Sequence, residues 1–301
     1  MAQNAHLSQL EYFMALATQR NFTKAARDCY VSQSALSQSI KALERELKTQ
    51  LVYRRRGGVE LTRTGKRFLV YARDILDLMR KAKDDISSFH GELVGRVIVG
   101  MPTSVGFYGF TKFLKTFIAR YPRIEVVFQL QDAEIVLEKL MAGETDFGLL
   151  PGIAAQPGLL VEPLFEDSWA LVCGPKHPLA HRRGLPPQEL AAQPFLVLEE
   201  SHRGQDDVLD QVFTKHRLNP PILLQADDME TLKRMALDNW GLVVLPQRMI
   251  REELKKGTLV DLKVKEFRRA HAVSLAYRSD RFPSEAEEKF LQALSETYKK
   301  N

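Results

Sequence analysis

Residues 22–48, FTKAARDCYVSQSALSQSIKALERELK, constrain the fold most strongly, because they indicate two short helices joined by a tight turn. Ala25 and Ala26 are small enough to let a second helix cross the first closely. The turn follows at residues 29–32, and Ser32 is a favourable N-cap for the second helix. Apolar residues then recur every three or four positions and predict one buried stripe: Leu36, Ile40, Leu43 and Leu47.

The opposite face of the second helix carries short, amide or basic side chains: Gln33, Ser34, Ser37, Gln38 and Lys41. Such side chains can approach base edges, and none of them is a carboxylate that would repel phosphate. This pattern is typical of a helix-turn-helix whose second helix enters the major groove of DNA. The alternative is a helical hairpin with a solvated polar face, and the charge distribution argues against it.

The positive charge of the chain is concentrated near its N-terminus. Residues 1–67 hold 12 Lys and Arg against 5 Asp and Glu, whereas the remainder holds 31 against 33. The formal net charge of +5 therefore comes from the first fifth of the sequence. A basic block on a helix-turn-helix favours a double-stranded DNA partner, because each neutralised phosphate releases a counterion.

Two short extended runs follow the second helix around Gly57-Gly58 and fit a β-hairpin, which would form the wing of a winged helix. An arginine run is often only a solvated face, but the preceding helix-turn-helix favours contact with backbone phosphates. Besides the second helix, the residues predicted to contact DNA are Thr23, Arg54, Arg55, Arg56, Thr62, Arg63 and Lys66.

This N-terminal region resembles the LysR-type transcriptional regulators. The resemblance covers about 60 residues at fixed spacing, which makes it specific. Its positions are Leu10, Phe13, Phe22-Thr23, Ala25-Ala26, Ser32-Gln33, Ala35-Leu36-Ser37, Ile40, Leu43-Glu44, Leu47, Leu51, Arg54, Leu61-Thr62 and Gly65. The family fold that this implies is an N-terminal winged helix-turn-helix, a long linker helix and a C-terminal α/β effector domain. That effector domain would have two subdomains and resemble periplasmic binding proteins.

The implied function is a DNA-binding transcriptional regulator, not an enzyme, that controls promoter activity in response to a small-molecule inducer. A separate solute-binding protein would explain only residues 92–301, and no leader or apolar run of about 18 residues is visible. We therefore expect a cytoplasmic protein without membrane contact. An enzyme with an active site between the two subdomains is a further alternative, but no group of residues in the sequence has a recognisable catalytic pattern.

The only cysteines are Cys29 and Cys173, which indicates a reducing compartment and no structural disulfide. A peroxide sensor of this family would need two close cysteines in the second subdomain, where only Cys173 lies. No cofactor is expected. His177 and His181 are four residues apart, but Pro178 prevents the helix that would align them on a metal.

Residues 68–91 are predicted to form a dimerisation helix. Apolar residues alternate at steps of four and three, as in a coiled-coil seam: Phe68, Ala72, Ile75, Met79, Ala82, Ile86 and Phe89. A helix docked on its own domain would also show an apolar stripe, although a wider one. The resemblance implies a homodimer or homotetramer on a pseudo-palindromic site, with RNA polymerase as a further contact.

From Glu92 onward, strands and helices alternate, which predicts a parallel α/β sheet. Expected strands are 94–100, 124–131, 146–150, 169–174, 195–198, 222–226, 242–245 and 271–277. Expected helices are 104–120, 133–142, 205–215, 229–239 and 284–300. By resemblance, residues 92–166 and 269–301 form one subdomain and 167–268 the other, with crossings near 165–168 and 267–271. The domains are therefore 1–67 for DNA binding, 68–91 for dimerisation and 92–301 for the effector.

The inducer is expected between the subdomains, at strand ends and helix N-termini. Thr103 and Ser104 follow a strand and open a helix, a favourable place for a carboxylate, and capping of the helix by either hydroxyl is the alternative. His202 and Arg203 follow another strand, where arginine suits a carboxylate, and a structural role for Arg203 stays open. Gln131 and Asp228 are further candidates, although the acids around Asp228 also fit a solvated helix start. These residues favour a small organic acid or aromatic metabolite.

Overall fold

The computed structural model describes residues 7–55, 58–88, 93–102, 105, 108, 110–199 and 208–298, without the side chain at position 112. The chain forms two compact units. The first comprises Met1–Gly95, Ala142–Glu144 and Phe282–Ala286, and the second comprises Arg96–Met141, Thr145–Arg281 and Glu287–Asn301.

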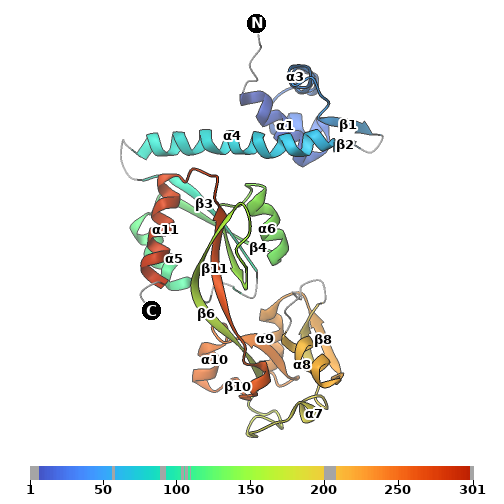
Figure 1. The fold of residues 1–301 in the computed structure, drawn as a ribbon, viewed down its shortest axis with the longest axis vertical. Coiled ribbons are helices and arrows are strands. Elements are labelled where there is room, and N and C mark those ends of the chain that lie inside the picture. The colour runs from blue at the N-terminus through green and yellow to red at the C-terminus, as the bar shows by residue number, and fades with distance from the viewer. Residues whose placement is uncertain are drawn as a thin grey trace. The chain divides into compact units, whose positions relative to one another are not determined.

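The first unit begins with a three-helix helix-turn-helix domain, followed by the wing and the linker helix (Figure 1). Its elements are α1 (Leu7–Gln19), α2 (Phe22–Asp28), α3 (Gln33–Glu46), β1 (Val52–Arg55), β2 (Gly58–Leu61) and α4 (Arg63–Ser88). Strands β1 and β2 pair antiparallel, as predicted for the wing. Ser32 caps α3 by accepting a hydrogen bond of 3.1 Å from the Ala35 N–H, as the sequence predicts.

The core of the helix-turn-helix consists of apolar side chains from all three helices. The predicted stripe of α3 is confirmed for Leu36, Ile40 and Leu43, which are buried against Ala25 and Ala26. It is wrong for Leu47, which follows the last helical residue and is 37% exposed. The stripe therefore ends where α3 ends.

The linker helix α4 begins at Arg63, five residues earlier than the predicted dimerisation segment. Thr62 starts it: the Thr62 hydroxyl accepts a 2.9 Å hydrogen bond from the Gly65 N–H and donates to the Gln50 carbonyl at 2.7 Å. A Cβ atom at Gly65 would lie 2.0 Å from the Leu51 carbonyl oxygen, so no larger residue fits. This close approach ties the start of α4 to the chain leading into the wing.

The second unit is built around a sheet with strand order β10-β6-β11-β5-β3-β4, in which β9 also pairs with β6. The strands are β3 (Gly95–Met101), β4 (Ile124–Leu130), β5 (Phe147–Pro151), β6 (Leu159–Cys173), β9 (Val243–Pro246), β10 (Val260–Asp261) and β11 (Ala270–Arg278). A separate parallel pair consists of β7 (Phe195–Leu198) and β8 (Ile222–Ala226). The sheet is not fully parallel as expected, because β6 and β11 run antiparallel to each other and to their other partners.

Strand β6 passes from one subdomain to the other, and β11 runs beside its first part (Figure 1). It pairs with β11 as far as Ser168, then with β9 from Trp169 and with β10 at Val172 and Cys173. The change of partner falls at the end of the predicted crossing 165–168. With 15 residues, β6 is long enough to pair with strands of both subdomains, and it therefore belongs to both.

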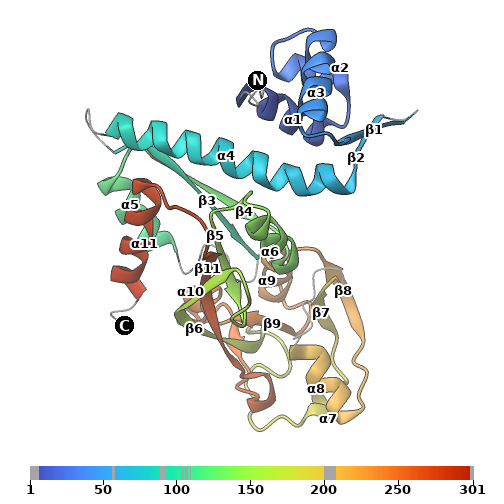
Figure 2. The same cartoon turned by 45° about the horizontal axis from the view of Figure 1, so that its top comes forward.

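Helices cover both subdomains, and α8 lies beside the β7–β8 pair (Figure 2). They are α5 (Thr111–Arg120), α6 (Ala133–Met141), α7 (Pro187–Leu190), α8 (Val208–His216), α9 (Met229–Leu237), α10 (Arg251–Lys256) and α11 (Glu285–Tyr298), with a 3₁₀ turn at Lys265–Phe267. Phe113 of α5 and Phe147 of β5 pack on Phe290 of α11, with ring centroids 5.2 and 5.6 Å apart. The helix expected from residue 104 begins only at Thr111, since the described residues 105, 108 and 110 lie in turns.

Candidate DNA interface and effector region

The predicted recognition face lies on the surface of the first unit. Gln33, Ser34, Gln38 and Lys41 are exposed along α3, whereas Ser37 is half-buried. The Ser37 hydroxyl accepts a 2.7 Å hydrogen bond from the guanidinium of Arg54. Ser37 therefore joins the recognition helix to the wing in addition to facing the surface.

Arg54 connects the wing to both helices of the motif. While it donates to Ser37, its guanidinium carbon lies 4.4 Å from the centroid of the Phe22 ring, at the start of α2. This cation–π contact and the hydrogen bond hold the arginine against the recognition face, where it adds positive charge. The sequence pattern places Arg54 in the wing but does not reveal either contact.

The other predicted DNA-contacting residues differ in accessibility. Arg55, which pairs with Glu60 at 3.3 Å, is exposed, and so are Thr23, Arg63 and Lys66. Thr62 is buried, and its hydroxyl caps α4 inside the domain, so its contact with DNA stays a prediction. Arg56 lies outside the described residues.

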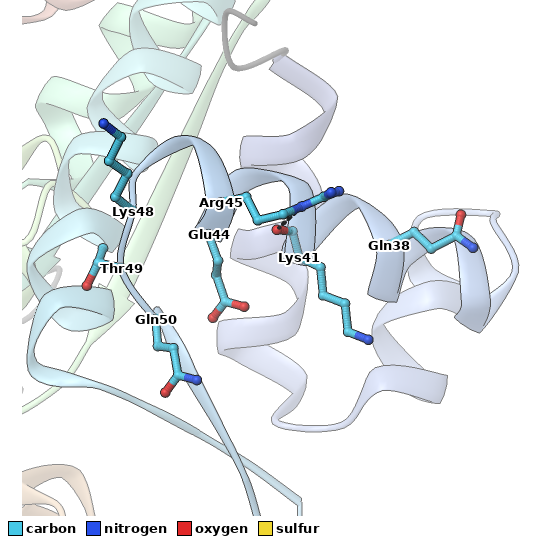
Figure 3. Close-up of a pocket in the computed structure, with 7 residues that line it drawn as sticks. All are labelled: Gln38, Lys41, Glu44, Arg45, Lys48, Thr49 and Gln50. Carbon is cyan, nitrogen blue, oxygen red and sulfur yellow. Dashed lines mark hydrogen bonds between the residues drawn. The ribbon is translucent and has the colours of Figure 1, made fainter.

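A groove of about 820 Å³ lies beside the C-terminal half of α3 (Figure 3). It is lined by Gln38, Lys41, Glu44, Arg45, Lys48, Thr49 and Gln50. Glu44 accepts hydrogen bonds from the Leu51 and Val52 N–H groups, at 2.8 and 3.2 Å, and so holds the loop that leaves α3. The sequence pattern selects neither Arg45 nor Lys48 as a DNA contact, although their spacing continues the exposed face of the helix.

In the effector domain, Gln131 stands at the end of β4. Its N–H donates to the carbonyl of Met101, the last residue of β3, at 3.1 Å. Its side-chain oxygen is buried and has no hydrogen-bond partner in the described part of the chain. A buried acceptor without a donor is unfavourable, so this oxygen is available to a ligand that brings one. Thr103, Ser104, His202 and Arg203 lie outside the described residues.

Asp228 has a structural role as the N-cap of α9. One carboxylate oxygen accepts a 2.8 Å hydrogen bond from the Thr231 N–H, and the other accepts from the Thr231 hydroxyl at 2.6 Å. Burial alone would raise the pKa of Asp228, but these hydrogen bonds outweigh it and hold the pKa below its ordinary value. Its part in effector binding stays a prediction, because both oxygens already have donors.

A charged cluster that the sequence did not reveal joins the segment after β3 to α9. The Tyr108 hydroxyl donates to Glu230, and the Lys233 ammonium, whose side chain is only 7% exposed, pairs with Glu230 at 2.9 Å and Glu253 at 3.0 Å. The same ammonium lies 5.1 Å from the centroid of the Tyr108 ring. Burial and the Glu230 hydrogen bond raise the pKa of Tyr108 to about 12, so the phenol remains a donor. The cluster therefore links the segment after β3 to α9 and, through Glu253, to α10.

The cysteine and histidine residues considered for redox or metal chemistry differ in accessibility. Cys173 is buried in β6, and burial raises the pKa of its thiol to about 12. His177 is buried and its Nδ1 accepts from the Leu179 N–H at 3.2 Å, while His181 is exposed. Among the described residues, no group of three or more His, Cys, Asp or Glu could hold a metal ion, and no helix is long and apolar enough to span a membrane.

Known proteins match the chain over nearly its whole length. Residues 7–66 match the profile "bacterial regulatory helix-turn-helix protein, lysR family", and residues 90–299 match "LysR substrate binding domain". A probable RuBisCO transcriptional regulator of Phaeodactylum tricornutum is 28% identical over 294 residues, which cover 96% of this chain and 95% of that protein.

Two solved structures share the fold. A full-length OxyR variant from Pseudomonas aeruginosa aligns with a TM-score of 0.73 at 22% identity, covering 99% of this chain and 95% of that one. Full-length CbnR complexed with its target DNA aligns with a TM-score of 0.66 at 20% identity, covering 97% and 99%. Because both family profiles match in the expected order and together span the described domains, the chain belongs to the LysR family of bacterial transcriptional regulators.

Proposed function

We propose that this regulator binds promoter DNA as a homodimer and responds to a small organic acid or aromatic metabolite. The observation that carries the DNA-binding role is the exposed face of α3, where Gln33, Ser34 and Gln38 present hydrogen-bonding side chains. Arg54 adds a cation held against that face by Ser37 and Phe22. Amide and hydroxyl groups can read base edges, and the arginine supports the contact with phosphate.

Salt-dependent binding of the full chain to a promoter fragment tests this proposal. The logarithm of the association constant is expected to fall linearly with the logarithm of salt concentration, by about 0.9 for each phosphate contacted. A promoter fragment should be bound more tightly than an unrelated duplex at the same salt. Absence of duplex binding even at low salt would reject the proposed function.

The surface proposed for dimerisation is the exposed apolar stripe of α4. The predicted seam needs correction at its start, because Ala72 is buried and Phe68 packs on Phe13 at 5.4 Å within the same domain. The apolar side chains that remain 39% to 61% exposed are Tyr71, Ile75, Leu78, Met79 and Ile86. A second copy of α4 would cover these side chains, and burial of apolar area would stabilise the pair. Tetramer assembly and contact with RNA polymerase are expected from the family.

Replacing Ile75 with aspartate is expected to convert the dimer to a monomer at micromolar concentration, because a carboxylate would be buried without a partner. Sedimentation equilibrium measures the mass directly. Lys115→Asp, at an exposed position on α5, is the control and should leave the dimer intact. An Ile75→Asp protein that stays dimeric would exclude this stripe from the interface.

We propose that the inducer binds near Gln131 and brings a hydrogen-bond donor, such as a hydroxyl or N–H group, beside its acidic group. The buried and unpaired side-chain oxygen of Gln131 supports this requirement. Thr103 and Ser104, which follow β3 in the sequence, are the residues proposed for the acidic group. His202, Arg203 and Asp228 stay candidates from the second subdomain.

Gln131→Met should separate ligand binding from folding. Without a ligand, the free energy of unfolding should stay the same or rise by about 1 kcal/mol, because an unsatisfied buried acceptor is removed. A small carboxylic acid or aromatic metabolite that raises the Tm of the wild type should lose most of that effect. Gln129→Met, on the same strand, is the matched control. A full thermal shift in Gln131→Met would place the ligand elsewhere.

We also propose that the bound molecule acts as an inducer without being chemically changed, and that no cofactor takes part. A regulator needs only different affinities of its conformations for the ligand. Recovery of an altered ligand after prolonged incubation with the protein would contradict this. Because its target is bacterial promoter DNA, the protein would act in the cytoplasm.

A further inference from the structure

The exposed face of α3 continues beyond the residues expected to read bases. Ser34, Gln38, Lys41, Arg45 and Lys48 follow one another at steps of four, three, four and three, which places them along one side of the helix and its last turn. Figure 3 shows Gln38, Lys41 and Arg45 on α3 and Lys48 on the loop that follows. The side chains change along this face from amide and hydroxyl groups to cations.

The length of α3 explains why amide and hydroxyl side chains are followed by cations along its exposed face. A helix of 14 residues is about 21 Å long, whereas the major groove is about 12 Å wide. If α3 crosses the groove at an angle with its first turns against base edges, its last turns lie over the sugar–phosphate backbone at the edge of the groove. We propose that Lys41, Arg45 and Lys48 form a phosphate clamp that binds this backbone, an inference that rests on the proposed DNA-binding function.

The electrostatics of the groove support an anionic partner. Lys41 and Lys48 have no ion-pair partner within the described region, and Arg45 uses only its Nε, which donates to the Lys41 carbonyl at 3.3 Å. Glu44 is the carboxylate among the lining residues, and it already accepts hydrogen bonds from two backbone N–H groups. The groove thus presents three cations and one committed anion, which suits phosphates spaced along a nucleic-acid strand.

The backbone at Lys48 bears on how this position is tested. Lys48 has a φ of 50°, in the left-handed region that glycine adopts without steric cost and lysine does not. The Thr49 N–H donates to the Glu44 carbonyl at 3.1 Å, so this conformation is the stop at the C-terminus of α3. A cation just beyond a helix C-terminus can also stabilise the helix dipole, so stability and DNA binding must be measured separately.

Lys48→Gly separates these two roles, because it removes the charge and relieves the backbone. Binding of the full chain is measured by fluorescence anisotropy across a salt series, with a promoter duplex and an unrelated duplex. Lys48→Gly and Arg45→Gln are each expected to lower the salt slope by about 0.9. At 0.15 M salt this corresponds to about fivefold weaker binding, equal for both duplexes. The Tm of Lys48→Gly should equal or exceed that of the wild type.

Lys83→Gln, on the exposed surface of α4, controls for net charge and should leave the slope unchanged. Unchanged slopes in Lys48→Gly and Arg45→Gln would overturn the phosphate clamp. A loss confined to the promoter duplex would also overturn it, because it would place these residues at bases. Unchanged DNA binding with lost promoter activity would assign the cations to an acidic protein partner instead. Absence of duplex binding by the wild type would defeat the DNA-binding function itself, which is a different result.

Discussion

A Ser37→Glu protein is expected to lose specific promoter binding, with an affinity at least about 100-fold below that of the wild type. The longer side chain carries a negative charge into the part of α3 that faces the duplex, where it meets phosphate and base acceptors. It would also pair with Arg54, which now donates to the Ser37 hydroxyl at 2.7 Å. The substitution therefore introduces one repulsive charge and neutralises one attractive charge.

Anisotropy with the promoter duplex measures this loss, and circular dichroism establishes that the helices are retained. Ser39→Glu is the matched control, because it places the same charge on the same helix two residues further along and away from the recognition face. It should retain most of the affinity. Wild-type affinity in Ser37→Glu would exclude this face of α3 from the groove.

Replacing Arg281 with methionine is expected to lower the free energy of unfolding of the effector domain by about 3–5 kcal/mol. Its guanidinium donates to the Asp146 carbonyl at 2.7 Å, to the Asp146 carboxylate at 2.9 Å and to Glu287 at 2.5 Å. Glu287 is fully buried and Asp146 nearly so. Without the arginine, two carboxylates would remain in the interior without their counter-ion.

Urea denaturation measures this change. Arg182→Met is the control, because Arg182 pairs with Glu189 on the surface, where the two side chains are 53% and 41% exposed. Its loss should cost less than about 1 kcal/mol. Adding Glu287→Gln to Arg281→Met should recover part of the stability, since one buried carboxylate that has lost its arginine is removed. Equal stability of Arg281→Met and wild type would show that the network does not stabilise the domain.

Interactions between residues close in sequence could be predicted. The cap at Ser32, the stripe of Leu36, Ile40 and Leu43, and the antiparallel wing depend on helical spacing, side-chain type and turn residues. The alternation of strands and helices likewise located most elements of the effector domain within a few residues. For β6 the sequence predicts a strand only from Trp169, because residues 159–168 contain Pro163 and three acidic residues, which are uncommon in strands.

Interactions between residues that are distant in the sequence could not be predicted from it. Leu47 and Thr62 have the residue types of a buried apolar position and an exposed polar one, yet Leu47 is exposed at a helix end and Thr62 is buried as a cap. Tyr108 meets Glu230 and Lys233 across more than a hundred residues of sequence, and no local pattern records that distance. The sequence also does not reveal that the side-chain oxygen of Gln131 lacks a hydrogen bond, because this depends on which groups the fold places around it.

Periodicity, charge and fixed spacing were enough to identify a winged helix-turn-helix regulator with a basic DNA-binding end. The folded chain was needed to show which apolar residues of α4 stay exposed for a partner and which pack within their own domain. It was also needed to show that Arg54 contacts Ser37 and Phe22, and that the cations at the end of α3 line one groove. The physical reason is that exposure and pairing depend on which segments fold against each other, whereas helical periodicity depends on neighbours in the chain.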